Sequence, residues 1–577
     1  MSVPASSSAA TDPSGGKSGL GKAIDRVRPF MWVPSLYLAM GIPYNAIVGG
    51  TAARMYKSLG YTDSQITVPL GFIGLAWSLK PFWAAFLDMY RTKKFFVLAM
   101  EILLAVLMGG VALSLPLPGF YSVSLAILCI AAFASSTQDI CGDGIYLTAL
   151  NRANQAKYAG VQGMFWTLGK VVATGIIVTV LDRVRQSQGW TYEHMWGGVF
   201  GAVALLMIGL AVYHLFYLPA GSVEERPASA RAVVRSFLGT AETFFQKRAF
   251  WGMIAFVFLY RLGEGLIIIE GQLFLQSGTD QGGLGLTVGQ VSEIESIWGT
   301  IAFVVGTTLG GLFVGKLGLK SCLWILGLAL NVPHLTFVIL SQLAADGHGL
   351  GYWSIVSLVS IEKFGYGFGF VGNMIYMMQQ IAPGRSTMTH YAFATALMQL
   401  MLVPTNMMSG PLADWLGFQT YFIVVMFASI PSAWAAFKAP FPREEDGATD
   451  ETAHITADDP SRLSVAQQRV QRLAGQASMF AMLHIIALLT FDASALGSLQ
   501  GAEPGTGSKQ FYWLCLFAVG KFVLTWYGWK RAGEAIAAGA AIGDKAYTGN
   551  ARGARVTLVL CVLASIGVLV FAARVTG

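Results

Sequence analysis

Residues 221–250 read GSVEERPASARAVVRSFLGTAETFFQKRAF, a polar stretch between two series of apolar segments. Before it, apolar segments fall near 31–53, 65–87, 95–115, 121–147, 160–181 and 196–218. After it, they fall near 250–276, 289–313, 320–344, 352–381, 387–408 and 419–437. A helix of about 20 apolar residues crosses roughly 30 Å of hydrocarbon. The pattern therefore predicts six membrane-spanning helices, a charged linker and six more.

Composition agrees with a membrane setting. Of 577 residues, 54% are hydrophobic and only 12% are charged, whereas about a quarter of the residues of a soluble protein are charged. The 67 glycines allow membrane helices to approach one another closely. The formal net charge of +7 is spread over short loops, which argues against nucleic-acid binding. We predict an all-α polytopic membrane protein.

Basic residues gather in alternate loops, and such loops face the cytoplasm. They precede the first segment, follow the second and fourth, and crowd the central linker: Lys17, Lys22, Arg26, Arg28, Arg91, Lys93, Lys94, Arg152, Lys157, Arg226, Arg231, Arg235, Lys247 and Arg248. Arg183 and Arg185 run against this rule but are outnumbered. The pattern predicts a cytoplasmic N-terminus, with residues 1–28 as a disordered tail rich in Ser, Gly and Ala.

The domain plan follows from these segments. We predict six-helix bundles at 29–219 and 250–438, a cytoplasmic linker at 220–249 and a second polar linker at 439–475. Residues 476–577 contain further apolar segments near 477–497, 510–530 and 556–573. The stretch between the last two is small and polar, so two or three extra helices are expected. These helices lie outside a core of two times six and are expected to pack against its exterior.

One apolar segment ends in carboxylates. Residues 135–150 read SSTQDICGDGIYLTAL, in which Asp139 and Asp143 are four apart and share a helical face, with Gln138 beside it. A carboxylate that faces lipid costs several kcal/mol, so this face is expected to point to the bundle interior or a watery cavity. The alternative is that both charges reach interfacial water at the helix end.

Other ionisable and aromatic residues lie on the same set of segments. Lys170 and Arg261 suit a negatively charged group of a solute. The alternative for Arg261 is that it and Glu264, three residues apart on one helix, neutralise one another. Glu270 and Glu362 lie deep in their segments. The candidates for binding a solute are Gln138, Tyr146, Lys170, Arg261, Glu270, Tyr366 and Asn373. Lys80, Glu293 and Glu295 are the residues most readily explained as internal salt bridges or end groups.

Two loops at equivalent places in the halves carry short basic turns. They read FLDMYRTKKFF (86–96) and GLFVGKLGLKSCL (311–323). Both resemble the gating-loop motif of the major facilitator superfamily, on the residues Asp88, Arg91 and Lys94 in the first copy and Lys316 and Lys320 in the second. The second copy lacks the acidic residue. The resemblance implies two pseudo-symmetric six-helix bundles that alternate in access.

A narrower resemblance covers roughly residues 30–440. The sequences TQDICGDGIYLTAL (137–150), LKPFWAAFLD (79–88), LYRLGEG (259–265), IEKFGYGFG (361–369) and RSTMTHYAFATAL (385–397) are similar to helices of the peptide–acetyl-coenzyme A transporter family. That family includes AmpG muropeptide permeases and acetyl-coenzyme A transporters. Cys141 and Gly142 and the long C-terminal extension depart from its pattern.

These observations predict a secondary transporter of the bacterial inner membrane that imports an anionic sugar- or peptide-containing solute, of the muropeptide or amino-sugar type, with protons. Asp139, Asp143, Glu264 and Glu362 are the predicted proton-coupling groups. The alternatives are a carrier of acyl-coenzyme A or another organic anion, and a membrane-embedded enzyme with His390 or His214 as a base. The expected partners are the solute, protons and lipid, with no nucleic acid, cofactor or metal.

Overall fold

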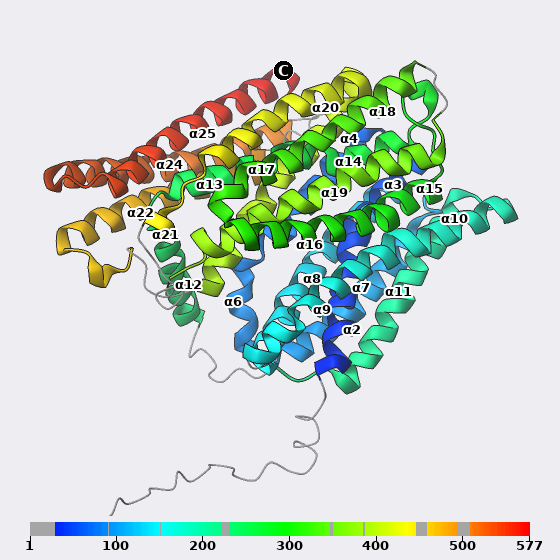
Figure 1. Ribbon diagram of the computed structural model, residues 1–577, viewed down its shortest axis with the longest axis horizontal. Coiled ribbons are helices and arrows are strands. Elements are labelled where there is room, and N and C mark those ends of the chain that lie inside the picture. Colours follow the sequence, from blue (N-terminus) through cyan, green and yellow to red (C-terminus); the bar gives the residue numbers. More distant parts are fainter. Residues whose placement is uncertain are drawn as a thin grey trace, which may run out of the picture.

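The computed structural model describes residues 29–90, 92–150, 152–221, 230–346, 350–384, 387–445, 458–492 and 508–576. Within these ranges the chain is helical and contains no strand. Eleven of the described helices are long and apolar enough to cross a membrane. Figure 1 shows them as a layered bundle of roughly parallel and antiparallel helices. The prediction of an all-α polytopic membrane protein is confirmed. The predicted tail, residues 1–28, lies outside the described residues.

Six membrane-crossing passes make up the first half. In chain order its helices are α2 (Pro29–Ile47), α3 (Thr51–Ser58), α4 (Asp63–Ile73), α5 (Leu75–Leu79), α6 (Pro81–Tyr90), α7 (Lys93–Ser114), α8 (Phe120–Ala149), α9 (Arg152–Lys170), the π-helix η1 (Val171–Ile176), α10 (Ile177–Gln188) and α11 (Tyr192–Tyr217).

The first two passes are interrupted helices. The first breaks between α2 and α3, where Gly50 has a φ of 120° that only glycine adopts readily. A Cβ at Gly50 would also lie 2.2 Å from the side-chain oxygen of Gln272 in the second half. The second pass breaks around Gly74 and Lys80, which separate α4, α5 and α6. An uninterrupted apolar run in the sequence does not reveal these breaks.

The second half repeats the plan after the linker helix α12 (Ala230–Phe245). Its helices are α13 (Phe250–Leu259), α14 (Leu262–Gln276), the short 3-10 turn η2 (Thr279–Gln281), α15 (Val288–Glu293), the π-helix η3 (Ile294–Trp298), α16 (Gly299–Leu317), α17 (Leu319–Asn331), η4 (Val332–His334), α18 (Leu335–Ala345), α19 (Tyr352–Tyr376), the π-helix η5 (Met377–Ile381) and α20 (Thr387–Lys438). The last two predicted segments of this half both lie in α20, which turns at Gly417, where φ is 72°.

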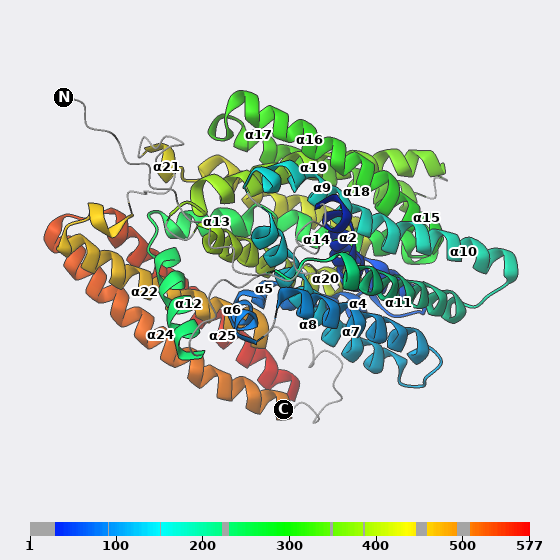
Figure 2. The same cartoon turned by 90° about the horizontal axis from the view of Figure 1, so that it is seen from below.

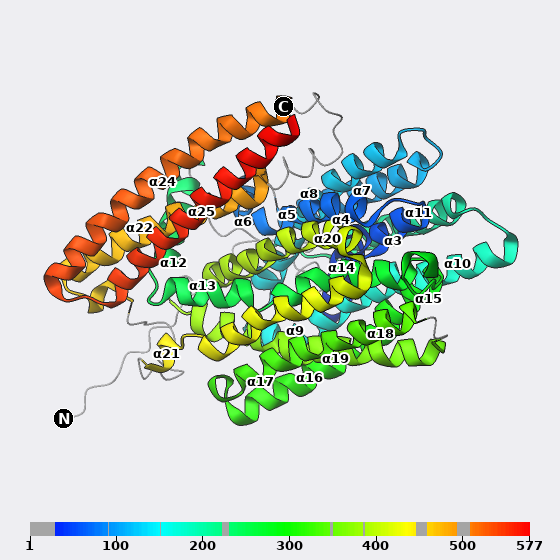
Figure 3. The ribbon, with the colours of Figure 1, turned by 90° about the horizontal axis from the view of Figure 1, so that it is seen from above.

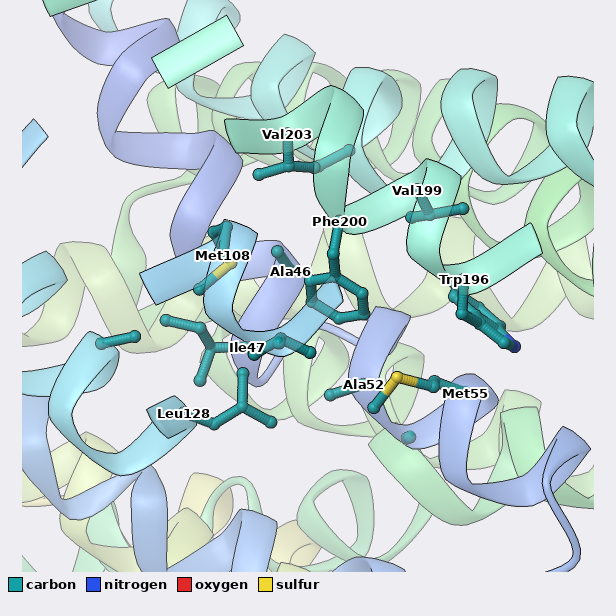
Figure 4. Packing of buried hydrophobic residues seen from close by; sticks show 14 of the residues in the cluster. Ala46, Ile47, Ala52, Met55, Met108, Leu128, Trp196, Val199, Phe200 and Val203 are labelled. Carbon is teal, nitrogen blue, oxygen red and sulfur yellow. The ribbon is translucent and has the colours of Figure 1, made fainter. Parts of the chain in front are cut away.

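Each half has its own apolar core. In the first half, Trp196 and Phe200 of α11 are buried against Met108 of α7, Leu128 of α8 and Ile47 of α2. Figure 4 shows these side chains converging between the helices. The second half has two separate clusters, one toward each end of its helices. The first cluster also takes in Ile269 and Leu273 of the second half, and one second-half cluster takes in Leu75 of the first, so apolar packing also joins the two halves.

The two halves meet through hydrogen bonds at one end of the bundle. We call this end, which carries residues 59–62 and 277–287, the predicted outer end, since both loops are poor in basic residues. There the Asp182 carboxylate accepts from the Gly289 N–H at 2.9 Å, and the Thr179 hydroxyl donates to the Gly289 carbonyl at 3.2 Å. Gly410 N–H donates to Thr67 at 3.1 Å, and Ser64 N–H to Asp414 at 2.9 Å. The halves are therefore closed at the predicted outer end.

Three long helices follow the second half. They are α22 (Val465–Ala487), which continues as the π-helix η8 (Leu488–Asp492), α24 (Ser508–Ile542) and α25 (Ala546–Thr576). Figure 2 and Figure 3 both show them side by side along the edge of the bundle, next to α12 and α13. The expectation of extra helices outside the core is confirmed, and the described part of the chain contains three long ones.

The boundaries in this region differ from the prediction. The helix α22 begins at Val465, inside the stretch predicted as a linker, because Ser464 and Gln467 form a capping box that starts the helix earlier. The small, polar stretch between the last two apolar segments is also helical. It forms the ends of α24 and α25, which turn at Gly543, where φ is 68°.

A group of contacts, here called the linker clamp, ties the C-terminal helices to the linker between the halves. The Asp458 carboxylate accepts from the Arg248 N–H at 3.1 Å and from the Tyr547 hydroxyl at 2.9 Å. The Asn550 amide donates to the Lys247 carbonyl at 2.7 Å. The Lys247 ammonium in turn donates to the carbonyl of Pro383, which follows η5, at 2.6 Å. The clamp thus joins α25, the start of α13 and the end of η5.

Replacing the central acceptor of the clamp is expected to destabilise the protein. Asp458→Ala removes a half-buried carboxylate that accepts from two groups, and bonds to a charged group contribute about 1.5–3 kcal/mol each. We expect a lower thermal unfolding midpoint in detergent. The control is Glu534→Ala, which removes an exposed ion pair with Arg531 and is expected to cost no more than about 1 kcal/mol. Equal midpoints for the two variants would contradict a holding role for Asp458.

Candidate functional site

The two α8 carboxylates face polar partners on α2 and at the α5–α6 junction. Asp139 forms an ion pair with Lys80 at 2.6 Å, so Lys80 serves as an internal salt bridge. Asp143, one turn later, accepts from the Tyr37 hydroxyl at 2.8 Å. The two carboxylates thus lie on one face, as their spacing predicts. Asp139 has a cation beside it, whereas the hydrogen bond recorded for Asp143 comes from a neutral phenol.

Gln138 points to a different neighbour. Its amide donates to Glu101 on α7 at 3.2 Å, and the same carboxylate oxygen lies 2.7 Å from His214 Nδ1 on α11. The other ring nitrogen of His214 lies 3.0 Å from the Ser35 hydroxyl on α2. Glu101, Gln138 and His214 are fully buried. This polar network binds four helices of the first half together and fixes the rotation of α8.

Arg261 and Glu264 form a bidentate ion pair in the second half. The guanidinium donates to the two carboxylate oxygens at 2.7 and 2.6 Å and to the Tyr366 hydroxyl at 3.2 Å. It also lies 5.0 Å from the ring centre of Phe370. Of the two possibilities considered for Arg261, the structure places it in mutual neutralisation with Glu264.

A second buried group of charges surrounds Lys363 on α19. Its ammonium lies 3.0 Å from Glu362 and 3.1 Å from Glu295 on η3. One cation therefore serves two carboxylates. The group sits beside the contact between the π-helices η1 and η3, where the Thr174 and Ser296 hydroxyls lie 2.7 Å apart. Inserted π-turns are frequent at functional sites because they reposition side chains within a helix.

Three other solute candidates lie near these charges or deep in the bundle. Lys170 ends α9 directly before η1 and is half-buried, and it makes no ion pair within the described part of the chain. Asn373 is buried, and neither polar atom of its side chain has a hydrogen-bond partner there. Tyr146 is buried against Tyr37 and donates to the Gln155 carbonyl at 2.5 Å. The seventh candidate, Glu270, lies at the predicted outer end.

The gating-loop candidates are described only in part. Arg91 and the Asp88 side chain lie outside the described part of the structure. Lys94 donates to the Leu215 carbonyl at 2.9 Å, which joins the start of α7 to the end of α11. Lys316 is exposed at the end of α16, and Lys320 lies 5.7 Å from the ring centre of Phe441.

Sequence reasoning missed three polar residues between the passes. Tyr37, the partner of Asp143, has no signal in the sequence that distinguishes it from other aromatic residues. Arg54 is buried on α3 and donates to the Thr174 carbonyl at 3.1 Å. Asp63 begins α4 and is also buried. Arg54 lies one residue beyond the first predicted span, and a basic residue at the predicted outer end departs from the charge rule.

The shape of the chain resembles solved transporters. A bacterial homologue of the human lysosomal transporter Spinster, in an inward-facing and unoccupied conformation, aligns with a TM-score of 0.55 at 14% identity, over 74% of this chain and 98% of that one. A D-xylose–proton symporter aligns with a TM-score of 0.54 at 14% identity, over 73% and 99%. At these identities the likeness shows the fold alone.

Sequence relatives give more detail, although no protein-family model matches the chain. The anhydromuropeptide permease of Escherichia coli (strain K12) is 24% identical over 408 residues, which cover 69% of this chain and 76% of the permease. The chain is an AmpG-like transporter of the major facilitator type. An AmpG 4 transporter candidate of Rickettsia felis is 21% identical over 410 residues, or 69% of this chain and 93% of that one. These relatives support a carrier and not a membrane-embedded enzyme.

A small cavity lies at the surface between the two halves of the transporter. The Gln399 side-chain amide of the second half donates to the Tyr44 hydroxyl of the first half at 3.4 Å. Both residues line this cavity of about 60 Å³, beside Trp77. Among the described residues, no group of three or more His, Cys, Asp or Glu side chains could hold a metal ion. The residues that line this cavity offer a solute aromatic rings and amides.

Breaking the network behind α8 is expected to destabilise the transporter strongly. His214→Ala leaves the Glu101 carboxylate buried with only the Gln138 amide as a recorded partner, and loss of one member of a buried pair costs about 3–5 kcal/mol. The measurement is the thermal unfolding midpoint in detergent. His194→Ala is the matched control, since His194 is exposed at the start of α11. A midpoint for His214→Ala no lower than that of the control would contradict this assignment.

Proposed function

We propose that the transporter imports an anionic solute that contains peptide or amino sugar, of the muropeptide type, together with protons across a bacterial inner membrane. In this proposal its N-terminus is cytoplasmic. The single observation that carries the coupling is the environment of Asp143. Among the four carboxylates considered for coupling, Asp139, Glu264 and Glu362 each have a cation within 3.0 Å. Asp143 has the Tyr37 hydroxyl.

A buried carboxylate without its own cation is the one most easily neutralised by a proton. Protonation removes its desolvation cost and leaves a hydroxyl that can still exchange hydrogen bonds with Tyr37. Because Asp139 one turn away shares the single cation Lys80, a second negative charge on this face is disfavoured. Asp143 is therefore proposed as the coupling site, with Asp139 as the partner of Lys80. Rocking of the two halves would expose this face to alternate sides.

The negative group of the solute is proposed to bind at Lys170. Arg261 is neutralised by Glu264, whereas Lys170 has no ion pair in the described structure and lies in the same electrostatic group as Glu295, Glu362, Lys363 and Arg54. These groups carry three positive and two negative charges, so one added carboxylate balances them.

Aromatic rings and an amide would hold the rest of the solute. Tyr44 packs against Trp77 and Trp166 with ring centres 4.8 and 5.2 Å apart. Such amphipathic rings suit sugar faces. Asn373 offers an amide with free hydrogen-bonding capacity among the described residues. The relative from Escherichia coli is an anhydromuropeptide permease, which supports this solute class.

The coupling is tested with Asp143→Asn in reconstituted vesicles that are placed in an acidic external buffer. We expect wild-type uptake of an anhydromuropeptide to rise with the imposed gradient. The variant is expected to lose this response about tenfold or more, in the range of typical coupling energies. Asp346→Asn, at an exposed carboxylate after α18, is the matched control. A variant that responds to the gradient as wild type does would remove Asp143 as the coupling site.

The solute site is tested by Lys170→Met and Lys170→Arg. Loss of the ammonium is expected to raise the KM for a muropeptide with a free carboxylate about tenfold, since a charged hydrogen bond contributes about 1.5–3 kcal/mol. The same variant should leave the KM for the carboxamide form unchanged, and arginine should restore binding in part. Lys545→Met, at an exposed site before α25, is the control. Uptake of acyl-coenzyme A in preference to muropeptide would favour the alternative carrier function.

A further inference from the structure

Two carboxylic side chains from opposite halves meet at the predicted outer end. Asp63 begins α4 in the first half, and Glu270 lies in α14 of the second. The helices α4 and α14 contact one another, and the two carboxyl groups lie close enough to interact electrostatically. Glu270 is 0% exposed and Asp63 is 4% exposed. Two ionised carboxylates only accept hydrogen bonds, so a hydrogen bond between these groups requires that one of them hold a proton.

Among the described residues, one cation faces the pair. Lys57 on α3 lies 2.7 Å from Asp63 and balances that carboxylate. The other charged group that faces the pair is Asp414 on α20, which is exposed and accepts from Ser64. The nearby Tyr421 hydroxyl donates to the Leu266 carbonyl at 2.7 Å and is thereby occupied.

Glu270 is consequently left without a partner of its own. Neither of its carboxylate oxygens has a hydrogen-bond donor among the described residues. The backbones around it are also tightly packed, because a Cβ at Gly410 would lie 2.3 Å from the Asp63 carbonyl oxygen. A buried, unpaired carboxylate costs far more than a neutral carboxylic acid that donates to a neighbour. The closed outer end therefore favours Glu270 with a proton.

We propose that Glu270 and Asp63 form a proton-operated lock, in which the predicted outer end closes when Glu270 takes up a proton and donates it in a hydrogen bond to Asp63. This lock rests on the proposed function only in that the two halves alternate in access. It differs from the coupling site proposed at Asp143. The proton at Glu270 is bound where the halves separate, and it sets how readily the outer end closes.

The sign of the pH dependence follows from the two environments. When the outer end opens, α4 separates from α14 and water solvates Glu270, which then ionises as an ordinary glutamate does. When the outer end is closed, Glu270 is buried without a donor among the described residues, so the neutral acid is its favoured form. The closed conformation binds more protons than the open one, so raising the pH shifts the population toward the open conformation. Acid on the outer side promotes closure.

The experiment measures the outer end directly, without solute. The full-length chain is placed in lipid nanodiscs with its five cysteines replaced by serine and nitroxide labels at Gln188→Cys and Gln281→Cys. These two positions are exposed at the outer ends of α10 and η2, in opposite halves. Pulsed electron spin resonance then gives the distance distribution from pH 5 to pH 9. We expect the longer-distance population of the wild type to grow at least threefold over this range.

Three variants separate the lock from a general effect of pH. Glu270→Gln keeps a neutral donor toward Asp63, so the short distance should persist at every pH. Asp63→Asn frees Lys57 to balance an ionised Glu270, so the pH response of the distance should also be lost. This variant tests the lock if Glu270→Gln does not fold. Glu534→Gln, at an exposed carboxylate of α24 that pairs with Arg531, should respond to pH as the wild type does.

Two results would overturn the lock. One is a wild-type distance distribution that is independent of pH, and the other is a wild-type pH response that persists in Glu270→Gln or Asp63→Asn. The outcome is distinguishable from failure of the proposed function. A flat distance distribution together with proton-driven muropeptide uptake removes the lock alone. A pH-responsive outer end together with uptake that ignores the proton gradient removes the coupling role of Asp143 alone.

Discussion

The cost of an unpaired charge away from water governs how the polar groups of this transporter are arranged. Most carboxylates deep in its helices lie beside a cation or a donor: Asp139 beside Lys80, Glu264 beside Arg261, and Glu101 beside His214. Such pairs contribute little net stability, because desolvation offsets the attraction, but loss of one partner is severe. The pairs therefore act mainly to fix which helix faces meet. The few groups that fall short of full pairing are the ones that can change state during transport.

Incomplete pairing also separates the roles assigned to the two halves. In the first half, Asp139 and Asp143 share one lysine, and in the second half Glu295 and Glu362 share another. The first group has one carboxylate more than it has cations, whereas the second, counted with Lys170 and Arg54, has one cation more than it has carboxylates. At the surface between them, Lys170 supplies a cation without an ion pair in the described chain. A proton on the first group and an anionic solute at the second would make both groups electrically neutral in the same conformation. Coupled transport requires such a conformation.

Much of the architecture was predictable because hydrophobic length and basic loops are local properties of the sequence. The two sets of six passes, the extra helices and the shared face of Asp139 and Asp143 all follow from such patterns. The breaks at Gly50 and Gly74 were not predictable, since an apolar run gives no sign of an interruption when glycine is frequent throughout. The partners of the site were also hidden. Tyr37 lies 106 residues from Asp143 in sequence, and Asp63 meets Glu270 only because α4 packs against the opposite half. Pairing across passes is set by tertiary packing, which composition and spacing do not encode.

The linker clamp has a mechanical consequence for the surrounding bilayer. Because α25 is bonded to the start of α13 through Asp458 and Asn550, the three C-terminal helices are fastened to the second half and follow it as one body. Any rocking of that half sweeps a broader perimeter through lipid than a two-times-six core would. More acyl chains must then tilt, stretch or compress with every turnover, and their deformation energy adds to the barrier between the two orientations. Membrane thickness and stiffness thereby become determinants of the transport rate.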